Sequence, residues 1–317
     1  MGPAAGNESG TLDFVLLGLW APPALRPLLW TALLLAYLAT MLGNGALVGL
    51  IALDRRLHRP MYLLLSHLAL LDAAYVSTTL PQALAHMASR RARLSLARCG
   101  AQLYVGISLG SCEALLLAAM ALDRSLAVCR PLHYTTLVTP LRCAALAGAA
   151  WTLGFALSVP NAAAALRLFP FCGPRGIRHF FCDIAPLLSL VCADTRVFEA
   201  NVLAATVLVI MVPFCLIATS YTRILATVLR MPSASGRLKA LSTCASHLIV
   251  VILFYGTTGV IHLRPKASYS PESKQVVSLS YTLVTPMLNP LIYSLRNKEV
   301  KAALGRLCGQ RRGTHFP

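Results

Sequence analysis

Long apolar segments separated by short polar stretches make up most of this 317-residue chain. Crossing the hydrocarbon core of a bilayer takes about 20 mostly apolar residues, and seven segments meet that length. They are residues 28–53, 61–88, 99–122, 143–166, 200–222, 240–263 and 275–295. Each should be a helix, because a backbone in lipid must satisfy its own hydrogen bonds and the alternating pattern of a membrane β-barrel is absent. The pattern predicts an all-α membrane protein, a bundle of seven transmembrane helices.

Composition supports a chain that lies mostly in lipid, since 57% of the residues are hydrophobic, 12% are charged and the mean hydropathy is +0.67. We expect three parts: an extracellular segment 1–27, a seven-helix domain 28–295, and a cytoplasmic tail 296–317 that begins with a short amphipathic helix. Residues 12–20 are too short to span and follow no basic stretch, so we expect no cleaved signal peptide.

The net charge of +17 comes from basic residues that punctuate the apolar runs. Nucleic-acid binding is therefore not favoured, because that function calls for one basic patch or stripe. Arg26 alone precedes the first span, whereas Arg55, Arg56 and Arg59 follow it, which predicts an outer N-terminus. The outer loop after the second span runs against this rule with Arg90, Arg91, Arg93 and Arg98.

Two features agree with an outer N-terminus. Asn7-Glu8-Ser9 is a glycosylation acceptor, which is useful only on the luminal or outer side. Four cysteines also fall on the predicted outer face, enough for two disulfides. They are Cys99, Cys172, Cys182 and Cys192. The remaining six lie in spans or on the inner side and should be reduced: Cys112, Cys129, Cys143, Cys215, Cys244 and Cys308.

Motifs at the helix ends resemble the olfactory branch of the rhodopsin-like, class A G-protein-coupled receptors. These motifs are LHRPMY at residues 57–62, MALDRSLAVCRPL at 120–132, KALSTCASHL at 239–248 and PMLNPLIYSLRN at 286–297. The resemblance runs from about Phe14 to Val300. Two positions depart from the family pattern, because Ser125 stands where most such receptors carry tyrosine and Ala69 where the family usually has serine.

The resemblance implies an odorant receptor of the plasma membrane and no enzyme activity. A small, neutral volatile organic ligand would bind inside the helix bundle and activate a stimulatory, olfactory-type heterotrimeric G protein, which raises cAMP. The outer loop 171–192 is also similar to the family, and it implies the disulfides Cys99–Cys182 and Cys172–Cys192. Membrane lipid is the other expected partner.

Asp72 and Glu113 are carboxylates inside apolar spans, a costly placement that marks a functional site or a polar network within the bundle. Together with Asn44 and Asn289 they could hold sodium or protons, since two nearby carboxylates repel when both are ionised. A protonated acid with satisfied hydrogen bonds is the alternative. No other cofactor and no metal site are expected.

By the resemblance, Arg124 at the cytoplasmic end of the third span moves toward the G protein on activation, while the adjacent Asp123 can hold it at rest. An interfacial anchor is the simpler alternative for this arginine. The remaining residues that the resemblance assigns to coupling and activation are Tyr221, Asn289, Pro290 and Tyr293.

Helical spacing from Cys99 places Gly106, Ile107, Gly110 and Ser111 on one face of the third span. The matched positions line the odorant pocket in the family, although ordinary helix packing explains any single one equally well. The corresponding residues on the other spans are Tyr75, Ala205, Thr206, Val209, Tyr255, Thr258, Gly259, His262, Leu279 and Thr282. Small and apolar residues with a few hydroxyl groups suit a volatile ligand.

Other receptor and enzyme classes lack their key residues. An amine receptor would need an acid where Gly106 stands, and an opsin would need a lysine within residues 275–295. Residues 179–183 have metal-like spacing, but Cys182 should be in a disulfide. A non-olfactory class A receptor and a ligand-gated ion pathway stay open, the latter because Asp72 and Glu113 are also typical of an ion path.

Overall fold

The computed structural model describes residues 13–19, 22–89, 93–167, 170–172, 176–263 and 271–313. Within these ranges, side chains are not described at residues 167, 243, 260–263, 271–274, 295–296 and 308–313. Asn7 and the side chains of His262 and Cys308 therefore lie outside the described part, as do Arg90 and Arg91.

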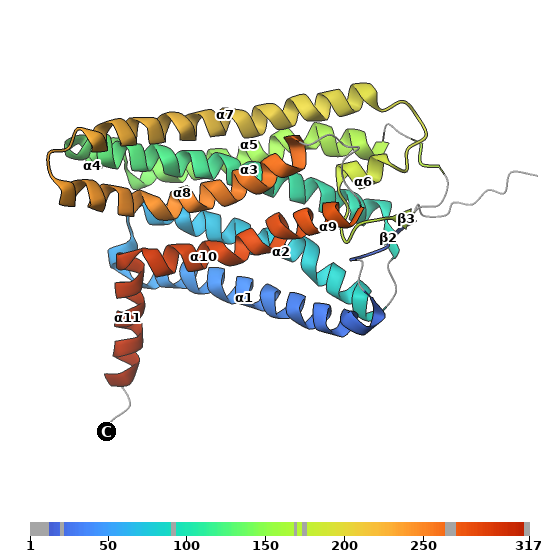
Figure 1. Cartoon of the computed structure of the whole chain (residues 1–317), viewed down its shortest axis with the longest axis horizontal. Coiled ribbons are helices and arrows are strands. Elements are labelled where there is room, and N and C mark those ends of the chain that lie inside the picture. The colour runs from blue at the N-terminus through green and yellow to red at the C-terminus, as the bar shows by residue number, and fades with distance from the viewer. Residues whose placement is uncertain are drawn as a thin grey trace, which may run out of the picture.

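Long helices aligned along one axis form the molecule (Figure 1), which confirms the predicted seven-helix bundle. Six helices are long and apolar enough to cross a membrane, and α8 is the seventh when its two parts on either side of Thr243 count as one span. The spans are α1 (Arg26–Leu53), α2 (Pro60–Ser89), α3 (Leu96–Cys129), α5 (Pro140–Arg167), α7 (Arg196–Leu229), α8 (Ala234–Leu263), and the series α9 (Pro271–Leu279), η5 (Ser280–Val284) and α10 (Thr285–Arg296).

The helices run beyond the predicted spans, and α3 and α7 continue seven residues past positions 122 and 222. Hydropathy marks only the part of a helix that hydrocarbon covers, whereas polar residues extend the same helix into the interface. The predicted single helix 275–295 also needs correction, because a π-helical turn, η5, interrupts it.

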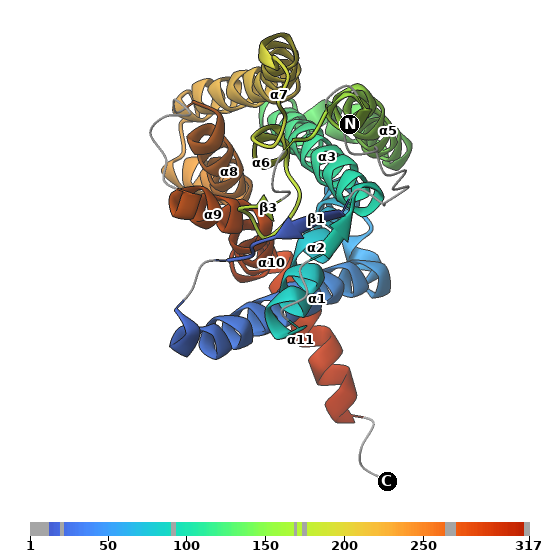
Figure 2. The ribbon, with the colours of Figure 1, turned by 90° about the vertical axis from the view of Figure 1, so that its right-hand side faces the viewer.

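The helix α3 lies in the centre of the bundle (Figure 2). In its most apolar stretch 67% of the residues are buried, against 11% in α7, so α7 lies at the periphery. Gly154 allows α5 to approach α3 closely, since a Cβ there would come within 2.9 Å of the Cys112 amide nitrogen and 3.0 Å of the Ser108 carbonyl oxygen.

Short elements close the ends of the bundle. At the outer end, β1 (Asp13–Leu16) lies between β2 (Arg93–Ser95) and β3 (Gly176–Ile177), antiparallel to β2 and parallel to β3, and α6 (Ile184–Leu188) follows. Short helices connect the spans: η1 (Pro23–Leu25), η2 (Arg55–Leu57), η3 (Pro131–His133) and α4 (Tyr134–Leu137). The sequence pattern did not predict the strands, because their partners are far apart along the chain.

The predicted short helix after the seventh span is present as α11 (Lys298–Gly313), which runs away from the bundle (Figure 1). Arg306 donates to Asp54 Oδ2 at 3.0 and 2.5 Å, and Arg59 donates to Glu299 at 2.8 Å. The hydrogen bond from Arg306 and that from the Arg56 amide hold the pKa of Asp54 below its ordinary value. Two ion pairs thus fix α11 to both ends of the first inner loop, at Asp54 and Arg59.

Candidate functional site

Two disulfides fasten the outer loop, and they join the pairs that the resemblance implied. Cys99 is bonded to Cys182 with the Cα atoms 5.4 Å apart, and Cys172 to Cys192 with the Cα atoms 5.8 Å apart. The first bond ties the beginning of α3 to the loop, so the loop lies over the end of the central helix.

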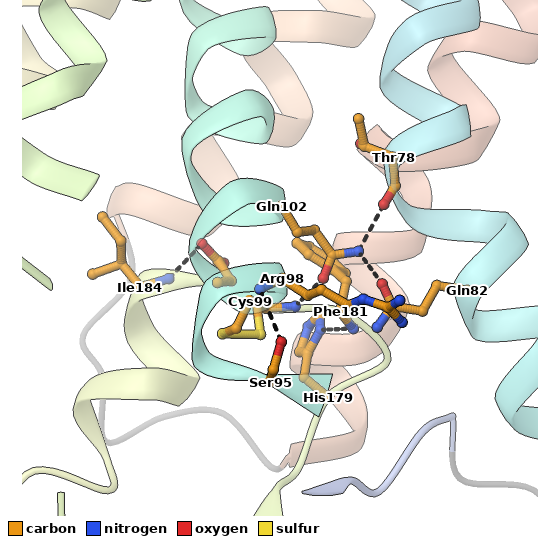
Figure 3. Close-up of a disulfide and its surroundings, with 11 residues drawn as sticks. Thr78, Gln82, Ser95, Arg98, Cys99, Gln102, His179, Phe181 and Ile184 are labelled. Carbon is orange, nitrogen blue, oxygen red and sulfur yellow. Dashed lines mark hydrogen bonds between the residues drawn. A yellow bond between two sulfur atoms is a disulfide. The ribbon is translucent and has the colours of Figure 1, made fainter. Parts of the chain in front are cut away.

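Gln102 lies beside the first disulfide and joins three segments (Figure 3). Its carbonyl oxygen accepts a hydrogen bond from the Cys182 amide at 2.8 Å, and its amide nitrogen donates to the Thr78 carbonyl oxygen at 2.7 Å and to Gln82 at 3.1 Å. The sequence did not predict a role for Gln102. The spacing of three residues from Cys99 was the available signal, since it places Gln102 on the same helix face.

The part of the outer loop just before Cys182 packs against α2 and α9. His179 donates from Nε2 to the Ser278 hydroxyl at 3.1 Å, while its Nδ1 accepts from the Phe181 amide at 3.5 Å. The ring stacks on Phe180 at 4.8 Å and meets Phe181 edge-on at 4.5 Å. Burial lowers the pKa of His179, which favours the uncharged ring in this packing. Both ring nitrogens are engaged, so the metal-like spacing of residues 179–183 reflects packing.

Open space lies beside α3 at the two candidate ligand-binding glycines. A Cβ added at Gly106 or at Gly110 would meet no atom within 4 Å, although α3 is the most buried span. Ile107 beside them is half-buried and packs against the buried cluster that contains Cys99 and Cys182. The Ser111 hydroxyl donates to the Ile107 carbonyl oxygen at 2.8 Å, so it is left to accept hydrogen bonds from a ligand.

The candidate residues on the other helices mostly face inward. On α7, Ala205, Thr206 and Val209 are half-buried whereas Val207 and Leu208 are exposed, which turns the first three toward the bundle. The other candidates with described side chains are half-buried or buried: Tyr75, Tyr255, Thr258, Gly259, Leu279 and Thr282.

Two of these residues differ in their hydrogen bonding. Thr282 is fully buried and donates to the Ser278 carbonyl oxygen at 2.8 Å. The Tyr255 ring lies 5.1 Å from both Phe214 and Phe254, and its buried hydroxyl has no hydrogen-bond partner among the described residues. Tyr75 packs edge-on against Tyr281 at 6.3 Å. Tyr255 is therefore the candidate donor with unused capacity.

The four residues predicted for an ion or proton network lie on α1, α2, α3 and α10, and two of them are hydrogen-bonded to each other. Asn289 donates to both oxygens of Asp72, at 3.2 and 2.9 Å, and Asn44 donates to the Thr40 and Pro286 carbonyl oxygens at 3.0 and 3.1 Å. Glu113 lies near enough to act electrostatically on Asp72. Three side-chain oxygens are buried without a hydrogen-bond partner in the described part of the chain: Oδ1 of Asn44, Oδ1 of Asn289 and Oε1 of Glu113.

At the cytoplasmic end, the expected pairing of Asp123 with Arg124 is not formed. No ion pair joins these two described residues; instead Tyr134 donates to Asp123 at 2.7 Å, and the Arg124 Nε is buried without a partner. The hydrogen bond to α4 thus takes the place of a direct ion pair at Asp123. Burial and the nearby Asp123 raise the pKa of Tyr134, which keeps its hydroxyl protonated as the donor.

His247 is a second residue whose role the sequence did not reveal, although the motif at residues 239–248 contains it. It is buried on α8, donates from Nε2 to the Leu117 carbonyl oxygen of α3 at 3.1 Å, and takes the Tyr221 hydroxyl of α7 on Nδ1 at 2.8 Å. Three spans thus meet at one imidazole ring. Tyr293, three residues after Pro290, is also buried, and its hydroxyl has no hydrogen-bond partner among the described residues.

Comparison with known proteins agrees with this arrangement. A model of the family "Olfactory receptor" matches residues 33–311. The chain is similar to olfactory receptor 10A7 of Homo sapiens, with 47% identity over 305 residues that make up 96% of each chain. Olfactory receptor 10C1 of Homo sapiens is 47% identical over 302 residues, which are 95% of this chain and 96% of that receptor.

Among solved structures, the crystal structure of squid rhodopsin has the same fold, with a TM-score of 0.71, covering 90% of this chain and 81% of that chain. At 15% identity this likeness shows the fold alone. The family match and the relatives carry the assignment, and they confirm the resemblance drawn from the helix-end motifs. The chain therefore belongs to the olfactory receptor family, as a multi-pass plasma-membrane receptor of the G-protein-coupled class and not an enzyme.

Proposed function

We propose that this receptor binds a small neutral odorant with one oxygen atom, held beside α3 at Gly106 and Gly110. The unpartnered Tyr255 hydroxyl is the observation that carries this proposal. Glu113, one turn after Gly110, acts electrostatically on that hydroxyl, which supports a position of Tyr255 near this part of α3. A ligand oxygen would accept from Tyr255, and burial of apolar carbon at about 25 cal/mol per Å² would supply most of the affinity.

A ligand panel on a matched carbon skeleton tests this proposal. Alcohols, aldehydes, ketones or esters should activate the receptor, and Tyr255→Phe should weaken their potency by about tenfold, since one hydrogen bond is worth roughly 1 to 1.5 kcal/mol. Tyr104→Phe is the control, because the Tyr104 hydroxyl donates to the Phe155 carbonyl oxygen at 3.3 Å. Activation by amines or carboxylic acids alone, with Tyr255→Phe behaving as the wild type, would contradict the proposal.

The G protein that we propose is the stimulatory, olfactory-type heterotrimer, with cAMP as the product of signalling. Support comes from the cytoplasmic end, where three buried groups have no hydrogen-bond partner among the residues that the structure describes: Arg124 Nε, Asp123 Oδ2 and the Tyr293 hydroxyl. Odorant-evoked cAMP should vanish in cells that lack the stimulatory α subunit and return when it is re-expressed. An odorant-evoked current that survives this loss would instead indicate a ligand-gated ion pathway.

We also propose that sodium or a shared proton occupies the network at Asp72 and Glu113. The three unpartnered oxygens of Asn44, Asn289 and Glu113 support this, because buried polar atoms are costly to leave unsatisfied. Replacing sodium with choline outside and inside vesicles should change the agonist affinity of the wild type but not that of Asp72→Asn. Equal sodium dependence in both proteins would favour the shared proton, and then affinity should follow pH.

A further inference from the structure

A seven-residue segment before α1, residues 13–19, lies across the outer end of the bundle (Figure 2). Its strand β1 pairs on one edge with β2 through Phe14 and Leu94 and on the other edge with β3 through Val15 and Gly176. Beyond the strand, the Leu17 amide donates to the Ile177 carbonyl oxygen at 2.9 Å and the Gly18 amide to that of His179 at 3.2 Å. The segment is thus hydrogen-bonded along both sides.

The two faces of this strand differ sharply in exposure. Phe14 and Leu16 are 0% and 1% exposed, whereas Val15 and Leu17 are 40% and 58% exposed. The Phe14 ring meets Phe171 edge-on at 5.2 Å and belongs to the core cluster that contains Cys99 and Cys182. The face with Phe14 and Leu16 therefore packs on the disulfide-bonded loop, and the face with Val15 and Leu17 is exposed.

The far end of the segment is fastened to the helix that carries candidate ligand residues. Leu19 packs against the cluster of Phe180 and Phe181, which also includes Leu279. Gln275 of α9 donates to the carbonyl oxygens of Gly18 at 3.1 Å and Arg178 at 3.3 Å. Gly18 has a φ of +72°, a left-handed turn that glycine adopts without strain.

We propose that residues 13–19 form a removable roof over the ligand cavity, and that the roof sets the rate of ligand exchange. Every described attachment of the roof is noncovalent, whereas two disulfides hold the loop beneath it. A three-stranded sheet this short has little stability of its own and opens locally. This inference rests on the proposed function, because the ligand cavity is the open space at Gly106 and Gly110 that was assigned to the odorant.

Labelling without a ligand tests the roof directly. Gly106→Cys places a thiol in open space, where its Cβ meets no atom within 4 Å, about 10 Å of helix below Cys99. A charged, membrane-impermeant methanethiosulfonate added outside should modify this thiol slowly. Phe14→Ala in the same background should speed the modification by about tenfold, because losing a buried phenylalanine ring costs more than the 1.4 kcal/mol that a tenfold change requires.

The matched control is Val15→Ala, which changes the exposed side of the same strand and should leave the labelling rate unchanged. Gln275→Ala removes the hydrogen bond from α9 to the Gly18 carbonyl oxygen and should also speed labelling. This second variant replaces Phe14→Ala if the latter does not reach the cell surface. The receptor without Gly106→Cys supplies the background from its native cysteines. Equal rates in wild type, Phe14→Ala and Gln275→Ala, or an equal gain in Val15→Ala, would overturn the roof.

Odorant kinetics provide the second test. A roof that does not touch the ligand changes the barrier for uptake and release alike, so both rates should rise in Phe14→Ala while the equilibrium potency stays near the wild-type value. A shift in potency at unchanged rates would overturn the proposal, because it would mean that the segment contacts the ligand. An absent odorant response in the wild type would contradict the proposed function alone, since the labelling experiment uses no odorant.

Discussion

The two ends of the bundle are held together in different ways. The outer end has two disulfides and the Gln102 hydrogen bonds, and the Cys99–Cys182 bond and Gln102 both lie at the beginning of α3. The cytoplasmic end is held by hydrogen bonds, such as those of Tyr134 and His247, and by the two ion pairs of α11. Beside them the Arg124 Nε has no partner among the described residues. Covalent bonds do not yield to small free energies, whereas one hydrogen bond contributes about 1 kcal/mol.

This difference indicates which end of the receptor can change shape. A signal that passes from ligand to G protein needs an end that keeps its form and an end that has two arrangements of similar free energy. The outer end fits the first role, and the cytoplasmic end fits the second, because its polar groups have partners to exchange.

Breaking the central disulfide should have the largest effect. Cys99→Ser or Cys182→Ser should abolish surface expression, because the loop loses its covalent tie to α3 across a sequence separation of 83 residues. Flow cytometry of an N-terminal epitope measures this. Cys172→Ser is the matched comparison and should retain more surface receptor, since its bond closes a separation of only 20 residues. Normal surface levels in both Cys99 and Cys182 variants would show that the outer end does not depend on this bond.

Removing the arginine at the opposite end should spare the outer end entirely. Arg124→Ala should abolish odorant-evoked cAMP while ligand binding and surface expression stay close to wild type, because the residue lies about 37 Å of helix below Cys99. Radioligand or fluorescent-ligand binding separates the two readouts. Coupling and affinity are linked reciprocally, so the variant should lose any rise in agonist affinity caused by the G protein. Full cAMP output would contradict the role assigned to Arg124.

Loosening the cytoplasmic end should raise activity without ligand. His247→Phe removes the hydrogen bonds from α8 to the Leu117 carbonyl oxygen of α3 and to Tyr221 of α7. Loss of about 1 kcal/mol from the resting arrangement should raise basal cAMP by roughly fivefold. His67→Phe is the control, since His67 accepts from Trp151 at 3.2 Å, between α2 and α5. Unchanged basal cAMP in His247→Phe would place the switch elsewhere.

The smallest effect should follow from Arg306→Ala, which frees α11 from Asp54. Amide exchange in α11 should rise while cAMP signalling changes little, because ion pairs near the surface contribute weakly. The Asp54 pKa is lowered in the fold, so this pairing is complete above the ordinary value of 3.8 and is lost only as the pH falls through the lowered pKa. No pH dependence from Asp54 is therefore expected near neutrality. An effect on cAMP as large as that of His247→Phe would contradict this ranking.

The sequence predicted the bundle well because span length is a local property. Each apolar stretch identifies a helix without knowledge of its neighbours, and the motif at residues 286–297 identified the family that the comparison confirmed. The bounds were less accurate, since α3 continues past position 122 through Asp123, Arg124 and Ser125 to Cys129. The π-helical turn at Ser280–Val284 has no counterpart in the apolar pattern and was missed.

The candidate site was predicted unevenly. Asp72 and Asn289 were named as one network and share two hydrogen bonds. Asp123 was expected to hold Arg124, but it accepts a hydrogen bond from Tyr134 of α4, a partner that the sequence did not indicate. Gln102 and His247 received no role from the sequence, since their partners lie on other segments and no local pattern marks them.

By itself the sequence determined the number of spans, their order and the family, because the cost of putting a polar backbone or side chain into lipid is paid residue by residue along the chain. The tertiary structure alone decided which polar groups pair: β1 with β2 and β3, Asp123 with Tyr134, and His247 with Tyr221. Pairing depends on distances and angles between segments that are remote in the chain, and a hydrogen bond weakens steeply when that geometry fails.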